Sequence, residues 1–368
     1  LNILGITVKD FSLKSWFKIF FLALWKLLTN WEKVDIYVAE MGIDSPKPPK
    51  NMEYLLSFLK PDIGIFLNAN AVHSETFDCL VDENDPDKRV EKIIHQIALE
   101  KGKLISSLSE QGIAILNADD QEVIQFGGKT RAEINTFGTQ EADLKLKKWE
   151  PSISGTTFTY TYLDQDFSLK FKDFVLPKKF GLSLAAAILT GIKLDIPIDE
   201  ITANLKQKLI IPPGRSSLFR GKNGSFVIDS SYNASFDPMI EMIELLDKIA
   251  PKRKIAILGD MREMGKEANM AHKKVIEETN KKVDLLILIG PLMKKAAPKT
   301  AHIFENAKQA TDFLVPKLLK EDTILVKGSQ NTLLLEIAVE QLLNDPKQSG
   351  ELCRRGAFWD KQRNKLIS

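Results

Sequence analysis

Polar side chains follow two apolar segments in the second half of this chain, at points where a strand would end. The longer stretch is Val227-Ile-Asp-Ser-Ser-Tyr-Asn-Ala-Ser-Phe-Asp-Pro-Met239, and the other is Ile255-Ala-Ile-Leu-Gly-Asp-Met-Arg-Glu-Met-Gly265. In both, an apolar run ends abruptly in carboxylate, hydroxyl or amide groups, and a helical pattern follows. Ligands of open parallel sheets bind just beyond the carboxyl ends of the strands. The two stretches therefore predict a ligand site at one edge of a sheet.

Further strand ends in the first half carry groups that could bind a cation. They supply Glu40, the run from Asn68 to His73, and Asn117-Ala-Asp-Asp120. A carboxylate and an imidazole that meet at one sheet edge can hold a divalent cation. Ordinary roles are also open, because Glu40 can cap a turn and His73 can be a structural histidine. Taken alone, the residues favour these ordinary roles.

The elements that must position these groups follow a β-α-β pattern in the first part of the chain. Strands are predicted at 34–40, 63–68 and 112–117, and helices at 51–59 and 87–103. Such alternation is typical of a parallel sheet. Residues 156–162 and 167–172 instead alternate polar and apolar side chains, which indicates antiparallel strands with one solvated face.

The last part of the chain returns to the β-α-β pattern after two helical stretches, 182–192 and 194–209. The break at Ile211-Pro-Pro-Gly214 predicts a domain boundary near residue 211. Strands are expected at 226–228, 255–258, 285–289 and 323–326, with helices at 238–249, 267–279, 307–319 and 332–343. The expected fold class is α/β. A parallel-sheet first domain with added antiparallel strands, residues 1–210, precedes a doubly wound, Rossmann-like second domain, residues 211–368.

The composition is that of a soluble protein, with 51 basic and 49 acidic residues among 368. This balance gives no basic field, so we expect no nucleic-acid partner. Cys79 and Cys353 lack metal-type spacing, which favours a reduced, cytoplasmic location. The apolar segment 16–28 is shorter than the roughly 20 residues that span a bilayer, and Lys18 and Lys26 interrupt it. We expect no transmembrane segment and a buried helix there, with an interfacial membrane helix as the alternative.

The order of short motifs through the chain resembles that of the Mur ligases, ATP-dependent enzymes that form amide bonds in peptidoglycan synthesis. The first group is Ala39-Glu-Met-Gly42, Lys60-Pro-Asp-Ile-Gly64, Asn68-Ala-Asn-Ala-Val-His73, Lys101-Gly-Lys103 and Leu116-Asn-Ala-Asp-Asp120. The second is Pro212-Pro-Gly-Arg215, Ile228-Asp-Ser-Ser-Tyr-Asn-Ala234, Leu258-Gly-Asp-Met261 and Val326-Lys-Gly-Ser329. Each motif is weak alone, but together they are highly specific. Tyr232-Asn-Ala234 and Gly259-Asp-Met261 favour the family members that add D-Ala-D-Ala.

The resemblance implies ATP and Mg²⁺ as cofactors, and UDP-MurNAc-tripeptide and D-Ala-D-Ala as substrates, of a monomeric ligase. In the family, ATP phosphorylates the carboxylate of the UDP-linked peptide to an acyl phosphate. The amine of the dipeptide attacks that carbonyl, and phosphate leaves. The site must therefore neutralise charge on the transferred phosphoryl group. The alternatives are another Mur-type ligase or a folylpolyglutamate synthase and, from a different class, a noncatalytic binding module.

The resemblance also assigns roles to single residues. Glu40 and His73 would ligate Mg²⁺, and Lys101 matches the position of a carbamylated lysine. A carbamate turns a cation into an anion that can join a metal site. Arg215 would approach the γ-phosphate, because its planar fork matches phosphate oxygens and stays charged. Lys101, Arg215 and His73 would thus be the catalytic residues.

Nucleotide and substrate contacts are implied in the same way. Asn117 and Asp120 would contact the nucleotide, although an Asx turn closing a strand is an alternative role for them. Asp229, Tyr232 and Asn233 would complete the nucleotide surface together with Arg215. The residues that would handle the incoming dipeptide are Asp260, Glu263, Lys327 and Ser329.

The chain departs from the family pattern in three places. Lys178-Lys-Phe-Gly-Leu-Ser-Leu-Ala-Ala186 lacks the His and Asn that usually precede the alanine-rich helix, and Asp229-Ser230 replaces an aspartate pair. No phosphate loop of the Gly-x-x-x-x-Gly-Lys-Ser/Thr or shorter Gly-Lys-Thr kind stands at the family's position. Gly127-Gly-Lys-Thr130 follows no predicted strand and lies downstream of Asp120, so we interpret it as a loop.

Truncation before Leu1 is the expected reason for the missing phosphate loop, because in the family that loop precedes a segment similar to Leu1-Asn-Ile-Leu-Gly-Ile. We therefore expect residues 1–368 alone to use ATP poorly. Robust ATP-dependent ligation by this polypeptide would contradict that expectation. A phosphate loop encoded in frame upstream of Leu1 would support truncation, whereas a start codon close by would favour a degenerate relative.

Overall fold

The computed structural model describes residues 6, 12–29, 35–71, 74–172, 174–262, 264–299, 301–329 and 332–367. The chain divides into two compact units, residues 1–42 and residues 43–368. The second unit contains both sheets of the protein's described part and all but one of the predicted site residues.

The first unit contains one long helix, α1 (Leu13–Thr29), which confirms the predicted helix but not its burial. Ile19 is buried, whereas Phe17, Phe21 and Leu28 are 73%, 67% and 75% exposed. The expectation of a buried helix is therefore wrong for most of α1, whose one buried side chain is that of Ile19. None of the helices in the described ranges is long and apolar enough to cross a membrane.

The predicted strand at 34–40 is also wrong for its described part. Residues 36–40 are assigned to no strand, and the side chains of Ile36, Tyr37 and Val38 are exposed. An alternating or apolar pattern becomes a strand only where a neighbouring strand supplies hydrogen bonds. Among the described residues, no strand pairs with this segment.

The first sheet of the second unit has the strand order β1-β2-β3-β4-β5-β6. Its strands are β1 (Ile63–Phe66), β2 (Ile113–Asn117), β3 (Glu133–Gly138), β4 (Leu144–Ser152), β5 (Gly155–Tyr162) and β6 (Gln165–Phe171). Strands β1 to β4 are parallel, and β4 to β6 form an antiparallel meander. The predicted parallel strands and the antiparallel pair are confirmed, and the meander closes at a turn formed by Leu163 and Asp164.

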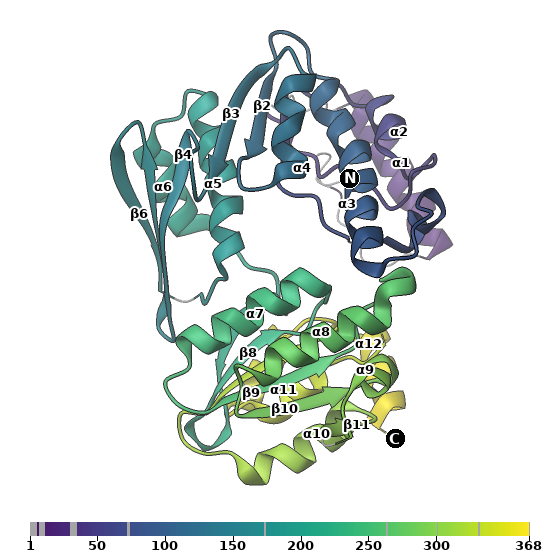
Figure 1. The fold of residues 1–368 in the computed structure, drawn as a ribbon, viewed down its shortest axis with the longest axis vertical. Coiled ribbons are helices and arrows are strands. Elements are labelled where there is room, and N and C mark those ends of the chain that lie inside the picture. The colour runs from purple at the N-terminus through teal and green to yellow at the C-terminus, as the bar shows by residue number, and fades with distance from the viewer. Residues whose placement is uncertain are drawn as a thin grey trace. The chain divides into compact units, whose positions relative to one another are not determined.

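Helices cover both faces of this sheet (Figure 1). They are α2 (Met52–Leu56), α3 (Pro86–Ser106), α4 (Gln121–Ile124), α5 (Lys178–Lys193) and α6 (Ile198–Lys208). Successive side chains of β2 point to opposite faces. Ala114 and Leu116 pack with Ala98 of α3, whereas Ile115 packs with Ile188 of α5. Burial on both faces explains why β2 is apolar throughout.

The second sheet has the order β11-β10-β9-β12-β8-β7. Its strands are β7 (Ser217–Arg220), β8 (Phe226–Ser230), β9 (Lys254–Gly259), β10 (Leu285–Ile289), β11 (His302–Phe304) and β12 (Thr323–Lys327). Five strands are parallel and β7 runs antiparallel at the edge. This is the doubly wound sheet that the sequence predicts, with the short edge strands β7 and β11 as additions.

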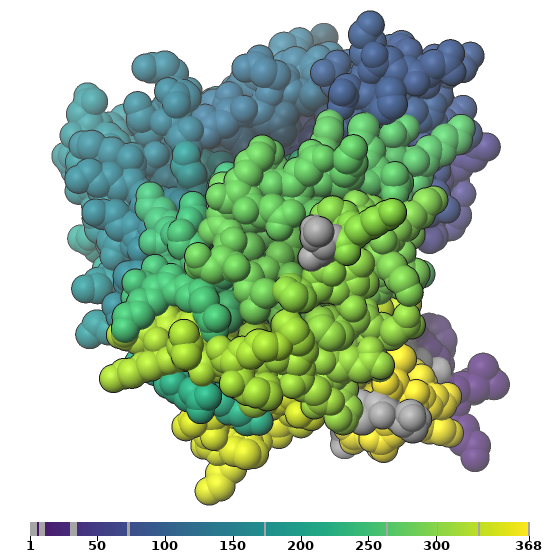
Figure 2. All heavy atoms as spheres, turned by 60° about the horizontal axis from the view of Figure 1, so that its bottom comes forward, coloured from purple at the N-terminus to yellow at the C-terminus, as the bar shows by residue number. Residues whose placement is uncertain are grey.

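The helices of this sheet lie on both of its faces (Figure 1), and Figure 2 shows the side chains of this part of the chain on one face of the molecule. They are α7 (Phe236–Ile249), α8 (Ala268–Asn280), α9 (Pro291–Ala296), α10 (Ala307–Leu314), α11 (Glu336–Leu342) and α12 (Ala357–Ile367). One core joins α7 and α8 to Ile228 and Ala256. The other joins α10 and α11 to Val227 and Ile255. The sheet therefore separates two cores, and its five parallel strands deliver their carboxyl ends to one edge.

Candidate functional site

Three of the predicted site residues contact one short backbone segment after β1. The Asn117 amide donates to the Leu67 carbonyl over 2.8 Å. The Lys101 Nζ lies 3.4 Å from the Asn68 carbonyl, and Asp120 Oδ2 accepts the Ala69 N–H over 2.9 Å. Lys101 comes from α3, whereas Asn117 and Asp120 follow β2. Three consecutive residues after β1 are thus fixed by side chains that the sequence motifs single out.

Lys101 is placed in an unusual environment for a lysine. Burial lowers the pKa of its amine, and the nearby Asp120 carboxylate opposes that shift. Loss of water disfavours the charged form of an amine more strongly than one partly solvated carboxylate favours it. The neutral amine is the nucleophilic form, so this environment favours reaction of Lys101 with an electrophile.

Asn117 and Asp120 also have local structural roles. Asn117 Oδ1 accepts the Asp119 N–H over 3.0 Å, which is an Asx turn. Asp120 caps α4 by accepting the N–H groups of Glu122 and Val123. The alternative role stated for these residues is therefore present, and their contact with a nucleotide remains a prediction.

The end of β12 places Lys327 against the loop that follows β8. Its Nζ donates to Ser230 Oγ over 3.2 Å and to the Asn233 carbonyl over 2.9 Å. Burial lowers the pKa of Lys327 to about 8. The charges of Glu241 and Asp229 oppose this shift of the Lys327 pKa, and the charge of Arg215 adds to it.

Asp229 is fully buried at the end of β8. Its Oδ1 accepts the Ser231 N–H over 3.0 Å, and burial raises the pKa of the carboxyl group. Its Oδ2 is buried with no hydrogen-bond partner among the described residues. A buried polar atom without a partner is costly and points to a group that is satisfied by a ligand or a proton.

Asp260, at the end of β9, is held by the next strand end. Its Oδ1 accepts the Met293 N–H of α9 over 2.8 Å, and its carbonyl accepts the Ser329 N–H over 2.9 Å. Burial raises the pKa of this carboxyl group, against the hydrogen bonds from Met293 and Leu292. Asp260 and Ser329 therefore lie side by side, as the sequence predicts for two strand ends.

His272, which lies in none of the motifs named above, fixes the residue after Asp260. Its Nε2 accepts the Met261 N–H over 2.9 Å, and its Nδ1 donates to the Ala268 carbonyl over 2.6 Å. This pattern needs a neutral imidazole with the proton on Nδ1. Burial lowers the pKa of the fully buried ring.

The protein should lose stability in mild acid because of His272. The folded pKa lies below the unfolded value of 6.5, so the unfolded state binds the proton first. The contribution is complete above that value and is lost as pH falls toward the folded pKa. The midpoint of urea unfolding should therefore drop between about pH 7 and pH 5.5. His272→Gln should flatten this dependence, whereas His95→Gln, at a half-exposed site, should keep it. An unchanged slope in His272→Gln would contradict the assignment.

Arg215 and Tyr232 meet above the same sheet edge. The Arg215 guanidinium carbon lies 4.7 Å from the centroid of the Tyr232 ring. The Tyr232 N–H donates to the Gly214 carbonyl over 3.1 Å. Gly214 has φ +75°, and a Cβ there would lie 3.1 Å from the Tyr232 backbone nitrogen, so this close approach needs glycine.

A cavity of about 290 Å³ lies next to both motif loops. Asn70 and Ala71, from the loop after β1, line one side. Ser235, Phe236 and Asp237, which follow Asn233, line the other. The walls combine apolar side chains with carboxylates, which is typical of a pocket for a small polar ligand.

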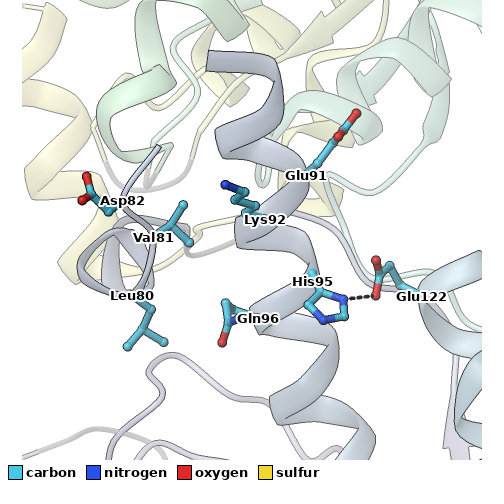
Figure 3. Close-up of a pocket in the computed structure, with 8 residues that line it drawn as sticks. All are labelled: Leu80, Val81, Asp82, Glu91, Lys92, His95, Gln96 and Glu122. Carbon is cyan, nitrogen blue, oxygen red and sulfur yellow. Dashed lines mark hydrogen bonds and ion pairs between the residues drawn. The ribbon is translucent and has the colours of Figure 1, made fainter. Parts of the chain in front are cut away.

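A second hollow lies on the outer side of α3, away from the predicted residues (Figure 3). It has a volume of about 470 Å³, and the His95 ring and the Glu122 carboxylate meet at its wall over 2.9 Å. Lys92, also at the wall, pairs with Glu83. Because these charges are already paired at an open surface, this hollow is a weaker candidate than the sheet edge.

The predicted Mg²⁺ ligands cannot be brought together from the described residues. Glu40 belongs to the first unit, and His73 lies outside the described residues. Glu263, which is predicted to contact the dipeptide and not the metal, also lies outside them. In the described ranges, no three His, Cys, Asp or Glu side chains form a group that could hold a metal ion. A metal site at Lys101 therefore rests on the family resemblance and on the environment of this lysine.

Two family models match the chain. The Mur ligase middle domain matches residues 22–189, and the Mur ligase glutamate ligase domain matches residues 214–330. The UDP-N-acetylmuramoyl-tripeptide–D-alanyl-D-alanine ligase of Buchnera aphidicola is 26% identical over 326 residues, 84% of this chain and 66% of the relative. The Escherichia coli enzyme of the same name is 25% identical over 330 residues, with the same two shares. The chain thus spans slightly less than two thirds of these relatives.

Solved structures share the fold. The MurF ligase of Thermotoga maritima, solved in complex with ADP, superposes with a TM-score of 0.71 at 21% identity, covering 92% of this chain and 70% of that one. MurF of Acinetobacter baumannii superposes with a TM-score of 0.66 at 18% identity, covering 78% of this chain and 62% of that one. With a middle domain and a glutamate ligase domain in the order that the motifs predict, the chain belongs to the Mur ligase family.

Proposed function

We propose that this chain forms the nucleotide-binding and acceptor-binding part of an ATP- and Mg²⁺-dependent ligase that joins D-Ala-D-Ala to UDP-MurNAc-tripeptide. The curated relatives named above carry this activity in their names. The chemistry begins with transfer of the γ-phosphoryl group to the tripeptide carboxylate, which gives ADP and an acyl phosphate. The dipeptide amine then attacks the acyl carbon, an amide bond forms, and phosphate leaves with the former carboxylate oxygen.

The observation that carries the proposal is the cavity between the two motif loops. Asn70 and Ala71 continue the segment that Lys101, Asn117 and Asp120 hold, and Ser235 to Asp237 continue the segment that Lys327 holds. The motif loop after β1 and the motif loop after β8 therefore line one space. A reaction that passes a phosphoryl group from a nucleotide to a second substrate needs both substrates in one such space.

Lys101 is proposed to be carbamylated. Its neutral amine would attack the carbon of CO₂ and lose a proton, which gives an N-carboxylate. Mg²⁺, when bound, would supply charge neutralisation for the phosphate oxygens. The lowered amine pKa raises the neutral fraction near pH 8, so the modification should form readily there.

Carbon-13 NMR of the protein under ¹³C-labelled bicarbonate should show one carbamate resonance. The resonance should be absent in Lys101→Arg and present in Lys103→Arg, which changes the neighbouring lysine of the same helix. A resonance that survives Lys101→Arg would assign the carbamate elsewhere and contradict this part of the proposal.

Phosphate release by the whole gene product tests the reaction. With ATP, Mg²⁺ and UDP-MurNAc-tripeptide, release should depend on added D-Ala-D-Ala. Turnover with a single amino acid and none with D-Ala-D-Ala would overturn the choice of acceptor. The second candidate is a single-amino-acid ligase of the same family. A diaminopimelate-adding enzyme of Listeria innocua is 28% identical over 237 residues, 60% of this chain.

A further inference from the structure

The C-terminal segment of the chain packs against the loop after β8. Arg354 lies in this segment, beyond the residues matched by the family model. Its Nη1 lies 2.7 Å from Glu336 Oε2 and 3.5 Å from the Ser231 carbonyl, and its Nη2 donates to the Tyr232 carbonyl. One guanidinium group thus joins a helix to two successive residues of the motif loop.

The Arg354–Glu336 pair is almost completely withdrawn from water. The two side chains are 3% and 0% exposed. Burial raises the pKa of Glu336, and the Arg354 charge opposes that shift. Buried ion pairs are costly unless further hydrogen bonds satisfy them, and they fix geometry more than they stabilise. Here Arg354 makes further hydrogen bonds to the loop that carries Tyr232, whereas Glu336 Oε1 has no hydrogen-bond partner among the described residues.

Tyr232 connects this buried pair to Arg215. The Arg354 guanidinium carbon lies 5.3 Å from the Tyr232 ring centroid, and that of Arg215 lies 4.7 Å from it. Arg215 is exposed, Tyr232 is half-buried, and Arg354 is buried. Cys353 lies next to Gly214, which precedes Arg215. A Cβ on Gly214 would lie only 3.0 Å from the Cys353 Sγ. The C-terminal segment therefore touches both the Tyr232 loop and the loop that carries Arg215.

We propose that Arg354, together with Glu336, is a positioning residue that holds Tyr232 and, through its ring, sets the direction of the exposed Arg215 guanidinium. The consequence for nucleotide binding rests on the proposed function. The positioning itself does not, because it concerns contacts within the chain. An exposed arginine otherwise samples many rotamers, and an aromatic ring with a fixed backbone restricts them.

Arg354→Met/Glu336→Leu tests the proposal by removing both members of the buried pair together. Replacing a buried ion pair with apolar residues of similar size is often tolerated, whereas removing one partner is not. Arg354→Lys keeps the charge but cannot donate in two directions from a planar fork. Lys361→Ala, at an exposed site of α12, is the matched control. Far-UV circular dichroism and urea unfolding establish that each variant is folded.

The direct readout is the Arg215 Nε–H resonance, assigned by its loss in Arg215→Lys. In the wild type, the Tyr232 ring should displace it from the position of a free arginine. In the double variant it should move to that position, in Arg354→Lys it should move part of the way, and in Lys361→Ala it should stay. An Arg215 resonance that stays unchanged in the folded double variant would overturn the proposal, as would an undisplaced resonance in the wild type.

Calorimetric binding of ADP with Mg²⁺ to the whole gene product and to its variants separates this inference from the proposed function. The double variant should bind about 3- to 10-fold more weakly than the wild type, the range expected for losing one oriented cation contact. A wild type that shows the displaced resonance but binds no ADP would contradict the nucleotide role and support the positioning. Equal ADP affinities with an unchanged resonance would contradict the positioning alone.

Discussion

Arg215→Ala should lower the rate of D-Ala-D-Ala-dependent phosphate release by the whole gene product at least about 100-fold, the usual cost of losing one preorganised charge-stabilising donor. The side chain is exposed, lies over Tyr232 and stands on a loop whose Gly214 admits no larger residue without a shift. It contributes to no core, so its loss should leave folding nearly unchanged. A guanidinium group in this position would stabilise the negative charge that develops on the transferred phosphoryl group.

Arg220→Ala is a matched control for this prediction. Arg220 is also exposed, and its guanidinium carbon lies 4.4 Å from the Phe226 ring, but it belongs to the edge strand β7 and not to a motif loop. It should retain the wild-type rate. Arg215→Lys should recover part of the activity, because the charge stays but the planar fork is lost. A rate for Arg215→Ala within about threefold of wild type would remove Arg215 from the proposed machinery.

The parallel strands and the two helical layers were predictable because their patterns are long and repeated. In β8, β9 and β12, apolar runs are followed by polar groups and helices, and burial on both faces requires such runs. The antiparallel pair β5–β6 was predictable because its residues alternate. In each case the order of apolar and polar residues along the strand predicts which of its faces are buried.

Elements with an interrupted pattern were not predictable. In β4 the register shifts between Leu146 and Lys148, so its alternation changes phase within the strand. Strand β11 has three residues and α9 has six, which is too short for a period to be read. The strand expected at 34–40 had the right composition, but composition does not say whether a partner strand is present.

The site was predictable only where its residues lie in motifs. Lys101 comes from one motif, and Asn117 and Asp120 come from another. Their meeting at three consecutive backbone residues follows from the sheet order. Arg354 stands in a polar C-terminal segment, and its partner Glu336 is one of two acids on the short helix α11. Neither residue has a local pattern that distinguishes it from a solvated charge, because their burial depends on a tertiary contact.

Gly290→Ala should destabilise the protein by about 3–5 kcal/mol, the sum expected from a strained backbone and an overfilled site. Gly290 has φ +111°, which L-residues with a side chain rarely adopt. A Cβ there would lie 2.5 Å from Asp260 Oδ1, and that atom accepts the Met293 N–H at the start of α9. The carboxylate cannot withdraw without giving up this hydrogen bond inside a buried site, so the strain has no inexpensive release.

The measurement is urea unfolding followed by far-UV circular dichroism, in which the midpoint should fall while the slope is kept. Gly350→Ala is the matched control, because a Cβ at Gly350 would meet nothing within 4 Å and its φ lies outside the left-handed region. It should be neutral or slightly stabilising, since alanine has less freedom to lose on folding. Equal midpoints for Gly290→Ala and Gly350→Ala would mean that Asp260 and α9 can separate at little cost. The contact between these two strand ends would then be too soft to define an acceptor site.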